Sequence, residues 1–143
     1  MHYRVLESGA QRKFAVTFDK GDEVLESLSQ FAKEHRLGAC RVTGLGAFCY
    51  AMLGQFDWER KHYKPVPIEE RVEVLSLVGN MMPREANPEL DVHVSVVKSN
   101  GSVCGGHLLE GYVKPRFEVT VEEGCVETSI AQACTTACNS NVA

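Results

Sequence analysis

The chain has 143 residues, of which 44% are hydrophobic and 24% charged, and this length and balance predict one globular domain. Its formal net charge of −4 argues against a broad basic face that grips nucleic acid. The first residues carry no apolar segment of the secretion-signal type, and the longest apolar run, VTGLGAFCYAML, is too short and glycine-broken to span a bilayer. We therefore expect a cytoplasmic protein with no membrane partner.

The first part of the chain predicts two strands and a helix. Tyr3 and Val5 begin a strand-like segment, and apolar and other residues alternate through RKFAVTF (12–18), as in a half-buried strand. The stretch GDEVLESLSQFAKEHRLG then places apolar residues at helical spacing, with acids in its first turn and Gly38 at its end. This is the one main helix that the sequence predicts.

The middle of the chain predicts further strands and one long loop. Segments 39–44 and 47–56 are apolar runs, and the Gly44-Leu45-Gly46 stretch between them predicts a strand bend rather than a phosphate loop. The polar stretch DWERKHYKPVPIEE (57–70) predicts a loop. We expect the aromatic residues that flank it to cover a subunit edge, with a pocket lining as the alternative; these residues are Tyr50, Trp58 and Tyr63.

Segment 71–82, RVEVLSLVGNMM, predicts a strand that is covered on both sides. Val72, Val74 and Val78 are expected on one face, with leucines on the other. Glu73 lies in this strand, and if it is buried we expect it to be ion-paired with Arg71 or Arg41. The alternative is a catalytic carboxylate beside the histidines described next.

Two strands, 91–98 and 102–109, flank the turn Ser99-Asn100-Gly101 and predict a β-hairpin. A three-residue loop with Gly101 in the left-handed conformation gives a register in which paired residue numbers sum to 200, which keeps the valines on one face. This register places His93 opposite His107, with Asp91 two residues away on the same face. Gly105, also on that face, is expected to leave open space.

Two imidazoles and a carboxylate on one face predict a three-ligand metal site with an open position. The predicted ligands are Asp91, His93 and His107. The alternative is a cross-strand histidine pair that is exposed or hydrogen-bonded and holds no ion.

A final strand, FEVTVEE (117–123), completes a mostly antiparallel sheet with one main helix, an α+β domain. Residues 125–143 are expected to form a short extension that is helical or disordered. The six cysteines predict free thiols. Cys134 and Cys138, four residues apart, would share a helix face, which favours packing of small residues over a soft-metal site.

Several motifs together resemble the plants and prokaryotes conserved domain, the PPC domain, which in plants accompanies AT-hook DNA-binding segments. They are the GDEVLESLSQFAKEH helix, the VTGLGAF turn, the EVLSLVGN strand, the GGHL segment and a final EV strand. The plant versions carry a stretch like GRFEILSLTG, which this chain matches at Arg71, Glu73, Leu75, Ser76, Leu77 and Gly79.

The resemblance implies a PPC-like domain over residues 1–124, assembled as a homotrimer and linked to DNA. An AT-hook of the R-G-R-P type is absent from this chain, and Asp91 stands where the family's H-x-H strand has its first histidine. Aspartate ligates zinc as histidine does, so a divalent metal such as zinc remains the predicted cofactor. The expected function is a regulatory or assembly module associated with DNA; the alternative is a metal-dependent enzyme or small-ligand binder whose substrate the sequence does not identify.

Overall fold

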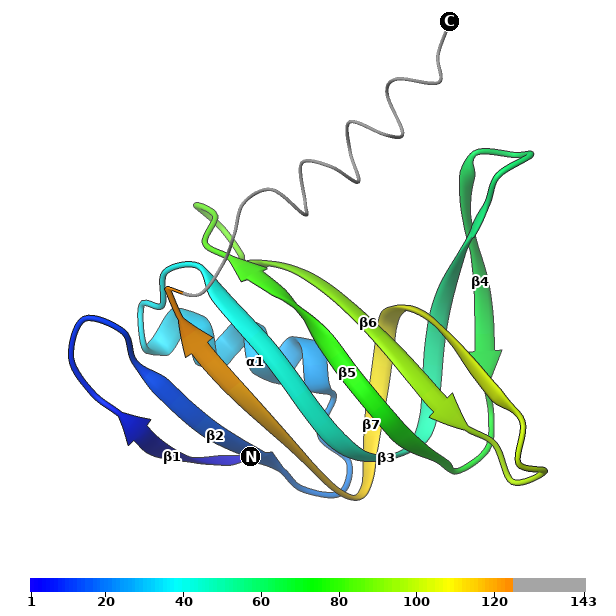
Figure 1. Ribbon diagram of the computed structural model, residues 1–143, viewed down its shortest axis with the longest axis horizontal. Helices are drawn as coiled ribbons and strands as arrows, with labels where there is room; N and C mark the ends of the chain where they lie inside the picture. The colour runs from blue at the N-terminus through cyan, green and yellow to red at the C-terminus, as the bar shows by residue number, and fades with distance from the viewer. Residues whose placement is uncertain (125–143) are drawn as a thin grey trace, which may run out of the picture.

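Antiparallel strands form most of the part of the chain that the computed structural model describes, residues 1–124 (Figure 1). In chain order the elements are β1 (His2–Glu7), β2 (Lys13–Phe18), α1 (Val24–Glu34), β3 (Cys40–Asp57), β4 (His62–Ile68), β5 (Val72–Met82), β6 (Glu89–Val97) and β7 (Val103–Glu123). The prediction of an antiparallel sheet with one main helix in a single domain is confirmed for these residues. Residues 125–143, with Cys134 and Cys138, lie outside the described part of the chain.

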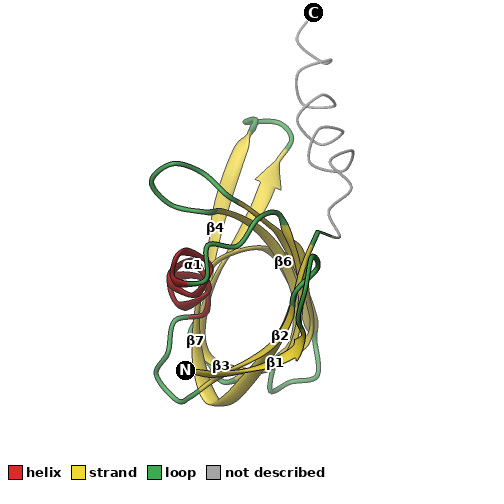
Figure 2. Ribbon diagram, turned by 90° about the vertical axis from the view of Figure 1, so that its left-hand side faces the viewer, coloured by secondary structure: helices red, strands yellow, loops and turns green. Residues whose placement is uncertain are grey.

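The strands follow the order β1-β2-β7-β6-β5-β3-β4, and an additional pairing of β7 with β3 curls the sheet around on itself. Figure 2 shows the strands encircling the interior, with α1 packed against one side. β7 pairs with β2, β3 and β6, so it closes β7, β6, β5 and β3 into a ring. Within residues 1–124, no helix has both the length and the apolar character needed to cross a membrane.

The core forms between the inner faces of the strands and the apolar stripe of α1. Phe48 of β3 and Phe117 of β7 stack with ring centroids 5.0 Å apart and planes inclined by 2°. Of the five apolar residues at helical spacing, the helix buries Val24, Leu28, Phe31 and Ala32, and Leu25 is partly buried. Their burial removes apolar surface from water and fixes the helix against the sheet.

Two glutamates fasten the ends of α1 to β7. Glu23, the N-cap, accepts a hydrogen bond from the backbone N–H of Glu26 (2.7 Å) and another from the N–H of Gly111 (2.8 Å). Glu123 accepts two hydrogen bonds from the Arg12 guanidinium, at 2.7 and 2.9 Å, and one from the Gly38 N–H at 2.8 Å. The helix is therefore held by charge-assisted hydrogen bonds as well as by its buried face.

Three sequence predictions about strands are corrected. Part of the segment predicted as a loop is strand β4, which pairs with the end of β3 and protrudes as a hairpin (Figure 1). The two strands predicted within 102–123 are one strand, β7. The register of β5 and β6 shifts between Val74 and Ser76, so the predicted alternation reverses: Leu77 is buried and Val78 is exposed.

Candidate metal centre

The β6–β7 hairpin has the register that the sequence predicted. Gly101 adopts a positive φ of 82°, and its N–H donates to the carbonyl oxygen of Lys98 at 2.9 Å. His93 pairs directly with His107. The short loop and the alternating valines thus bring two imidazoles from separate strands to one face.

Gly105 and Gly106 are needed because backbones come close to them. A Cβ on Gly105 would lie 2.7 Å from the carbonyl oxygen of Val94, and one on Gly106 would lie 2.7 Å from that of Gly54. The expected open space at Gly105 is therefore filled by the neighbouring strand. The paired glycines let β7 fit closely between β6 and β3 and so set the position of His107.

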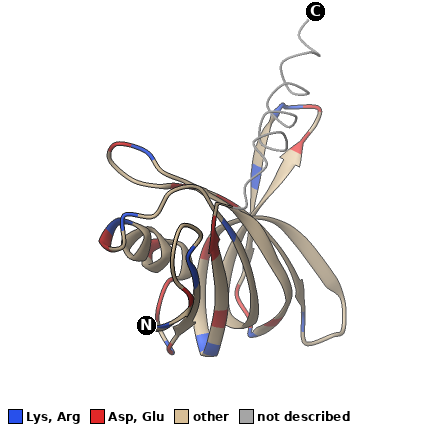
Figure 3. Ribbon diagram, turned by 60° about the vertical axis from the view of Figure 1, so that its left-hand side comes forward, with Lys and Arg blue, Asp and Glu red and all other residues tan. Residues whose placement is uncertain are grey.

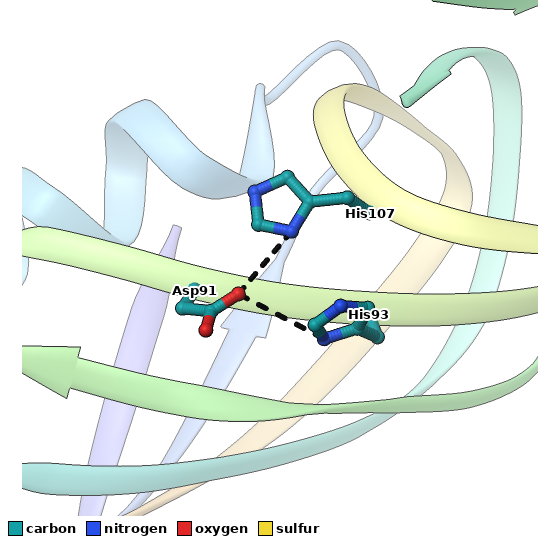
Figure 4. A group of neighbouring side chains, drawn as sticks. All are labelled: Asp91, His93 and His107. Atoms are coloured by element: carbon teal, nitrogen blue, oxygen red, sulfur yellow. Dashed lines mark ion pairs between the residues drawn. The ribbon is translucent and has the colours of Figure 1, made fainter. Parts of the chain in front are cut away.

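The structure brings Asp91, His93 and His107 together on that face (Figure 4). The Nδ1 atom of His107 is 3.2 Å from Oδ1 of Asp91, and the Nδ1 atom of His93 is 3.8 Å from the same oxygen. The two imidazole rings are 5.1 Å apart, inclined by 79°. One ligand atom from each residue lies within 4.8 Å of the other two.

His107 is the least exposed member, with 20% of its side chain accessible, against 46% for Asp91 and 60% for His93. Desolvation lowers the pKa of His107, the negative charge of Asp91 partly opposes this, and His93 adds to the lowering. Its Nδ1 atom is shielded from solvent and has no hydrogen-bond partner within residues 1–124, despite its proximity to Asp91. A neutral imidazole with an unpartnered nitrogen is the state in which histidine binds metals.

The donor set fits a small divalent cation. Two ligands that each lie about 2.0–2.1 Å from a tetrahedral ion are separated by about 3.3 Å, and the observed separations of 3.2 and 3.8 Å bracket this value. Three protein ligands leave a fourth position open. One carboxylate oxygen and two imidazole nitrogens are donors typical of zinc and related metals.

Gly79 of β5 places Asp91. It pairs with Val92, and a Cβ at Gly79 would overlap the backbone of Asp91 and Val92. The close fit of β5 against β6 at this point is possible only for glycine, so Gly79 helps to define where the Asp91 carboxylate lies.

Tyr63 of β4 is a neighbour of the site that the sequence did not reveal. The centroid of its ring lies 5.5 Å from that of His107. Tyr63 also contacts the ring of Phe56, which in turn contacts Trp58, so a row of aromatic rings follows the β3–β4 hairpin. The segment was predicted to be a loop, so this proximity was missed. The sequence feature that pointed to this hairpin is the pair of aromatic residues Phe56 and Tyr63 on either side of the turn, which the structure pairs across the two strands.

Glu73 does not join this group. It pairs with Val97, whereas Asp91 pairs with Asn80, seven positions further along β5 and roughly 20 Å away. Glu73 is exposed, so the burial on which the predicted pairing depended is absent, and within residues 1–124 no ion pair joins it to Arg71 or Arg41.

The fold and the site define a small α+β domain with a three-residue candidate metal centre on the outer face of its sheet. The sequence profile of the Plants and Prokaryotes Conserved (PCC) domain, abbreviated PPC above, matches residues 5–124. The chain belongs to this family, which confirms the resemblance inferred from its motifs.

Two solved structures of similar proteins cover most of the chain. One is a candidate DNA-binding protein from Bacteroides thetaiotaomicron, with 25% identity, a TM-score of 0.74, and coverage of 87% of this chain and 86% of that one. The other is a metal-containing protein from Archaeoglobus fulgidus, with 30% identity, a TM-score of 0.72, and coverage of 85% and 82%.

A curated relative is the AT-hook motif nuclear-localized protein 24 of Arabidopsis thaliana, 26% identical over 103 residues. The match covers 71% of this chain and 32% of the relative. The chain therefore spans about a third of the length of that protein.

Proposed function

We propose that this chain is a metal-binding PPC-domain protein in which Asp91, His93 and His107 hold a divalent cation, zinc in the first instance. The observation that carries the proposal is the desolvated Nδ1 of His107, which has no hydrogen-bond partner and lies next to a carboxylate and a second imidazole at separations that suit one ion. The metal-containing relative from Archaeoglobus fulgidus supports it.

The charge balance of the site also favours a cation. An ionised carboxylate and two neutral imidazoles carry one negative charge, and a divalent ion would leave a net charge of about +1 facing the open position. A bound metal would supply Lewis-acid chemistry to an oxygen ligand at that position. The proposal includes no reaction, because Glu73, the predicted catalytic candidate, lies far from the site.

Elemental analysis after reconstitution with zinc tests the proposal. Wild-type protein is expected to retain about one zinc per chain after dialysis, and His107→Ala and Asp91→Asn to retain much less. His62→Ala is the matched control, since His62 lies at the start of β4 outside the cluster. Wild-type protein that retains no metal, or a His62→Ala loss equal to that of the site variants, would refute the assignment.

We further propose that the domain assembles as a homotrimer through the outer face of its sheet. Leu45, Leu75 and Val78 are exposed there by 62%, 44% and 41%, on adjacent strands β3 and β5. Exposed apolar side chains on neighbouring strands are typical of interaction surfaces. Light scattering should give three times the chain mass for wild-type protein and a smaller mass for Leu75→Glu. A monomeric wild-type protein would exclude the trimer.

The role of such an assembly is proposed to be that of a DNA-associated regulatory or assembly module. The Bacteroides thetaiotaomicron relative and the AT-hook relative support the link to DNA, and the acidic net charge of −4 limits it to a local contact. Figure 3 shows acidic and basic residues interspersed over the visible strands. Absence of duplex binding at low salt would exclude direct contact. A cytoplasmic location stays a prediction of the sequence.

A further inference from the structure

A second site lies away from the metal centre, where β3, β5, β6 and β7 leave a hollow of about 660 Å³. The residues that matter for its chemistry are Gly46, Ala47, Arg71, Glu73, Lys98 and Arg116. The hollow is as large as those that bind small organic molecules.

An irregularity in the pairing of β3 with β7 creates the hollow. Gly46 pairs with Phe117 and Phe48 pairs with Val113, so one residue of β3 faces three residues of β7. The additional residues of β7, which include Arg116, leave the regular ladder. On the β3 side, Gly46 and Ala47 line the hollow, and the Arg116 carbonyl oxygen comes so close to Gly46 that a Cβ there would lie 2.6 Å from it. Such irregularities are over-represented next to functional sites because they redirect side chains.

The charges around the hollow are mostly positive. Arg71, Lys98 and Arg116 line it, and Glu73 is the one carboxylate among the residues that line it. Within residues 1–124, no ion pair engages Arg71 or Arg116. This excess of cations stands out in a chain whose formal net charge is −4.

A nearby carboxylate, Glu70, does not satisfy the two arginines. It accepts hydrogen bonds from the backbone N–H and the hydroxyl of Ser99, at 2.9 and 3.1 Å. These bonds, with a smaller contribution from Lys98, lower the pKa of Glu70. Its contribution is therefore to order the β6–β7 loop beside Lys98, while Arg71 and Arg116 remain available.

We propose that this hollow binds a phosphate group. Arginine guanidinium groups bind phosphate oxygens with paired hydrogen bonds, and lysine adds a point charge. Glu73 opposes an anion close to it, so the phosphate would lie on the arginine side, and the carboxylate would face the remainder of the ligand. Two sources carry this group: a small phosphorylated molecule and the backbone of a nucleic acid. The site is independent of the metal centre.

Isothermal titration calorimetry of the full chain with inorganic phosphate, at constant ionic strength, tests this proposal. We expect saturable binding that weakens about tenfold or more in the double variant Arg71→Gln with Arg116→Gln. Glu73→Gln should strengthen binding by about threefold, because it removes a repulsive charge. Arg4→Gln, an exposed arginine of β1 outside the hollow, is the matched control and should bind as wild type does.

Competition identifies the source of the phosphate. A DNA duplex that displaces phosphate from wild-type protein, and binds more weakly to the double variant, would assign the hollow to a nucleic-acid backbone. Displacement by ribose 5-phosphate with no effect of DNA would assign it to a small molecule. The proposal would be overturned by absence of saturable phosphate binding, by an unchanged affinity in the folded double variant, or by an equal loss in Arg4→Gln.

Discussion

Replacement of Glu123 by glutamine should loosen the attachment of α1 to β7. The carboxylate accepts hydrogen bonds from Arg12 and from the Gly38 N–H that follows the helix. Arg12 also donates to the carbonyl oxygen of the helix C-cap, His35, at 3.1 Å. Glutamine keeps the size of the side chain and one acceptor, but it loses the charge, so the substitution isolates the electrostatic contribution.

The hydrogen bonds from Arg12, followed by that from Gly38, lower the pKa of Glu123 from 4.5 to about 2, against an opposing effect of burial. A difference of this size corresponds to about 3 kcal/mol at most. Solvent reaches 33% of the Arg12 side chain, so screening reduces the expected loss of unfolding free energy to about 1–2 kcal/mol at pH 7. For a domain of this size, this lowers Tm by several degrees.

The loss should depend on pH in a defined direction. Because the folded-state pKa lies below the unfolded-state value, the carboxylate stabilises the fold fully above pH 4.5 and progressively less as the pH falls toward 2. Urea denaturation at pH 7, 5 and 3 should therefore show a shrinking difference between wild type and Glu123→Gln.

Glu122→Gln provides the control for this experiment. Glu122 pairs with Lys13 at 2.6 Å, with both side chains 33% exposed, and its loss should cost about 0.5 kcal/mol or less. An equal loss in the two variants, or a difference for Glu123→Gln that stays constant from pH 7 to pH 3, would refute the reasoning.

Three further predictions concern the metal centre and its strands. Gly79→Ala should weaken zinc binding by about tenfold or more, since the new methyl group would displace β6 at Asp91; competition with a chromophoric chelator measures this, and an unchanged affinity would contradict the role of Gly79. Zinc at a hundred times its Kd should raise the unfolding free energy by about 2.7 kcal/mol, and EDTA should reverse this effect. A Tm that changes with neither zinc nor EDTA would argue against a metal site in the folded state. Gly106→Ala should destabilise the protein by about 1–3 kcal/mol in urea denaturation, because its Cβ would come within 2.7 Å of the Gly54 carbonyl oxygen. A variant as stable as wild type would show that β3 can move aside without cost.

The sequence predicted that Asp91, His93 and His107 lie together because the determinants of this grouping are local. The loop at Ser99 to Gly101 and the alternating valines fix the hairpin register within a few residues of His93 and His107. Asp91 follows from the same alternation, since side chains two positions apart share a face of a strand. The hairpin alone brings these three residues to one face, and the close fit at Gly79 of β5 and at Gly54 of β3 then refines their positions.

Features that depend on contacts between strands far apart in the sequence were harder to predict. The register shift near Leu75 exchanges the buried and exposed positions that alternation predicted for Leu77 and Val78, and it arises where β5 meets β6. Strand β4 contains Pro65 and Pro67, which argued for a loop, yet an edge strand tolerates prolines because one of its sides has no neighbour to bond. The hollow at Arg116 was missed because it results from unequal lengths of β3 and β7 between two paired positions.

The pairing of β2 with β7 has a kinetic consequence. Lys13 is paired with Glu122 and Phe18 with Phe117, so these contacts join residues about a hundred positions apart. Closing such long chain segments costs entropy before the contacts compensate for it, and domains rich in distant pairings fold slowly. During synthesis, β2 can pair with β1 at once, but its other edge must wait for β7, the last strand of the domain, to emerge from the ribosome. Until then the apolar residues of β2 stay exposed, which makes this interval the stage at which the chain is most open to aggregation.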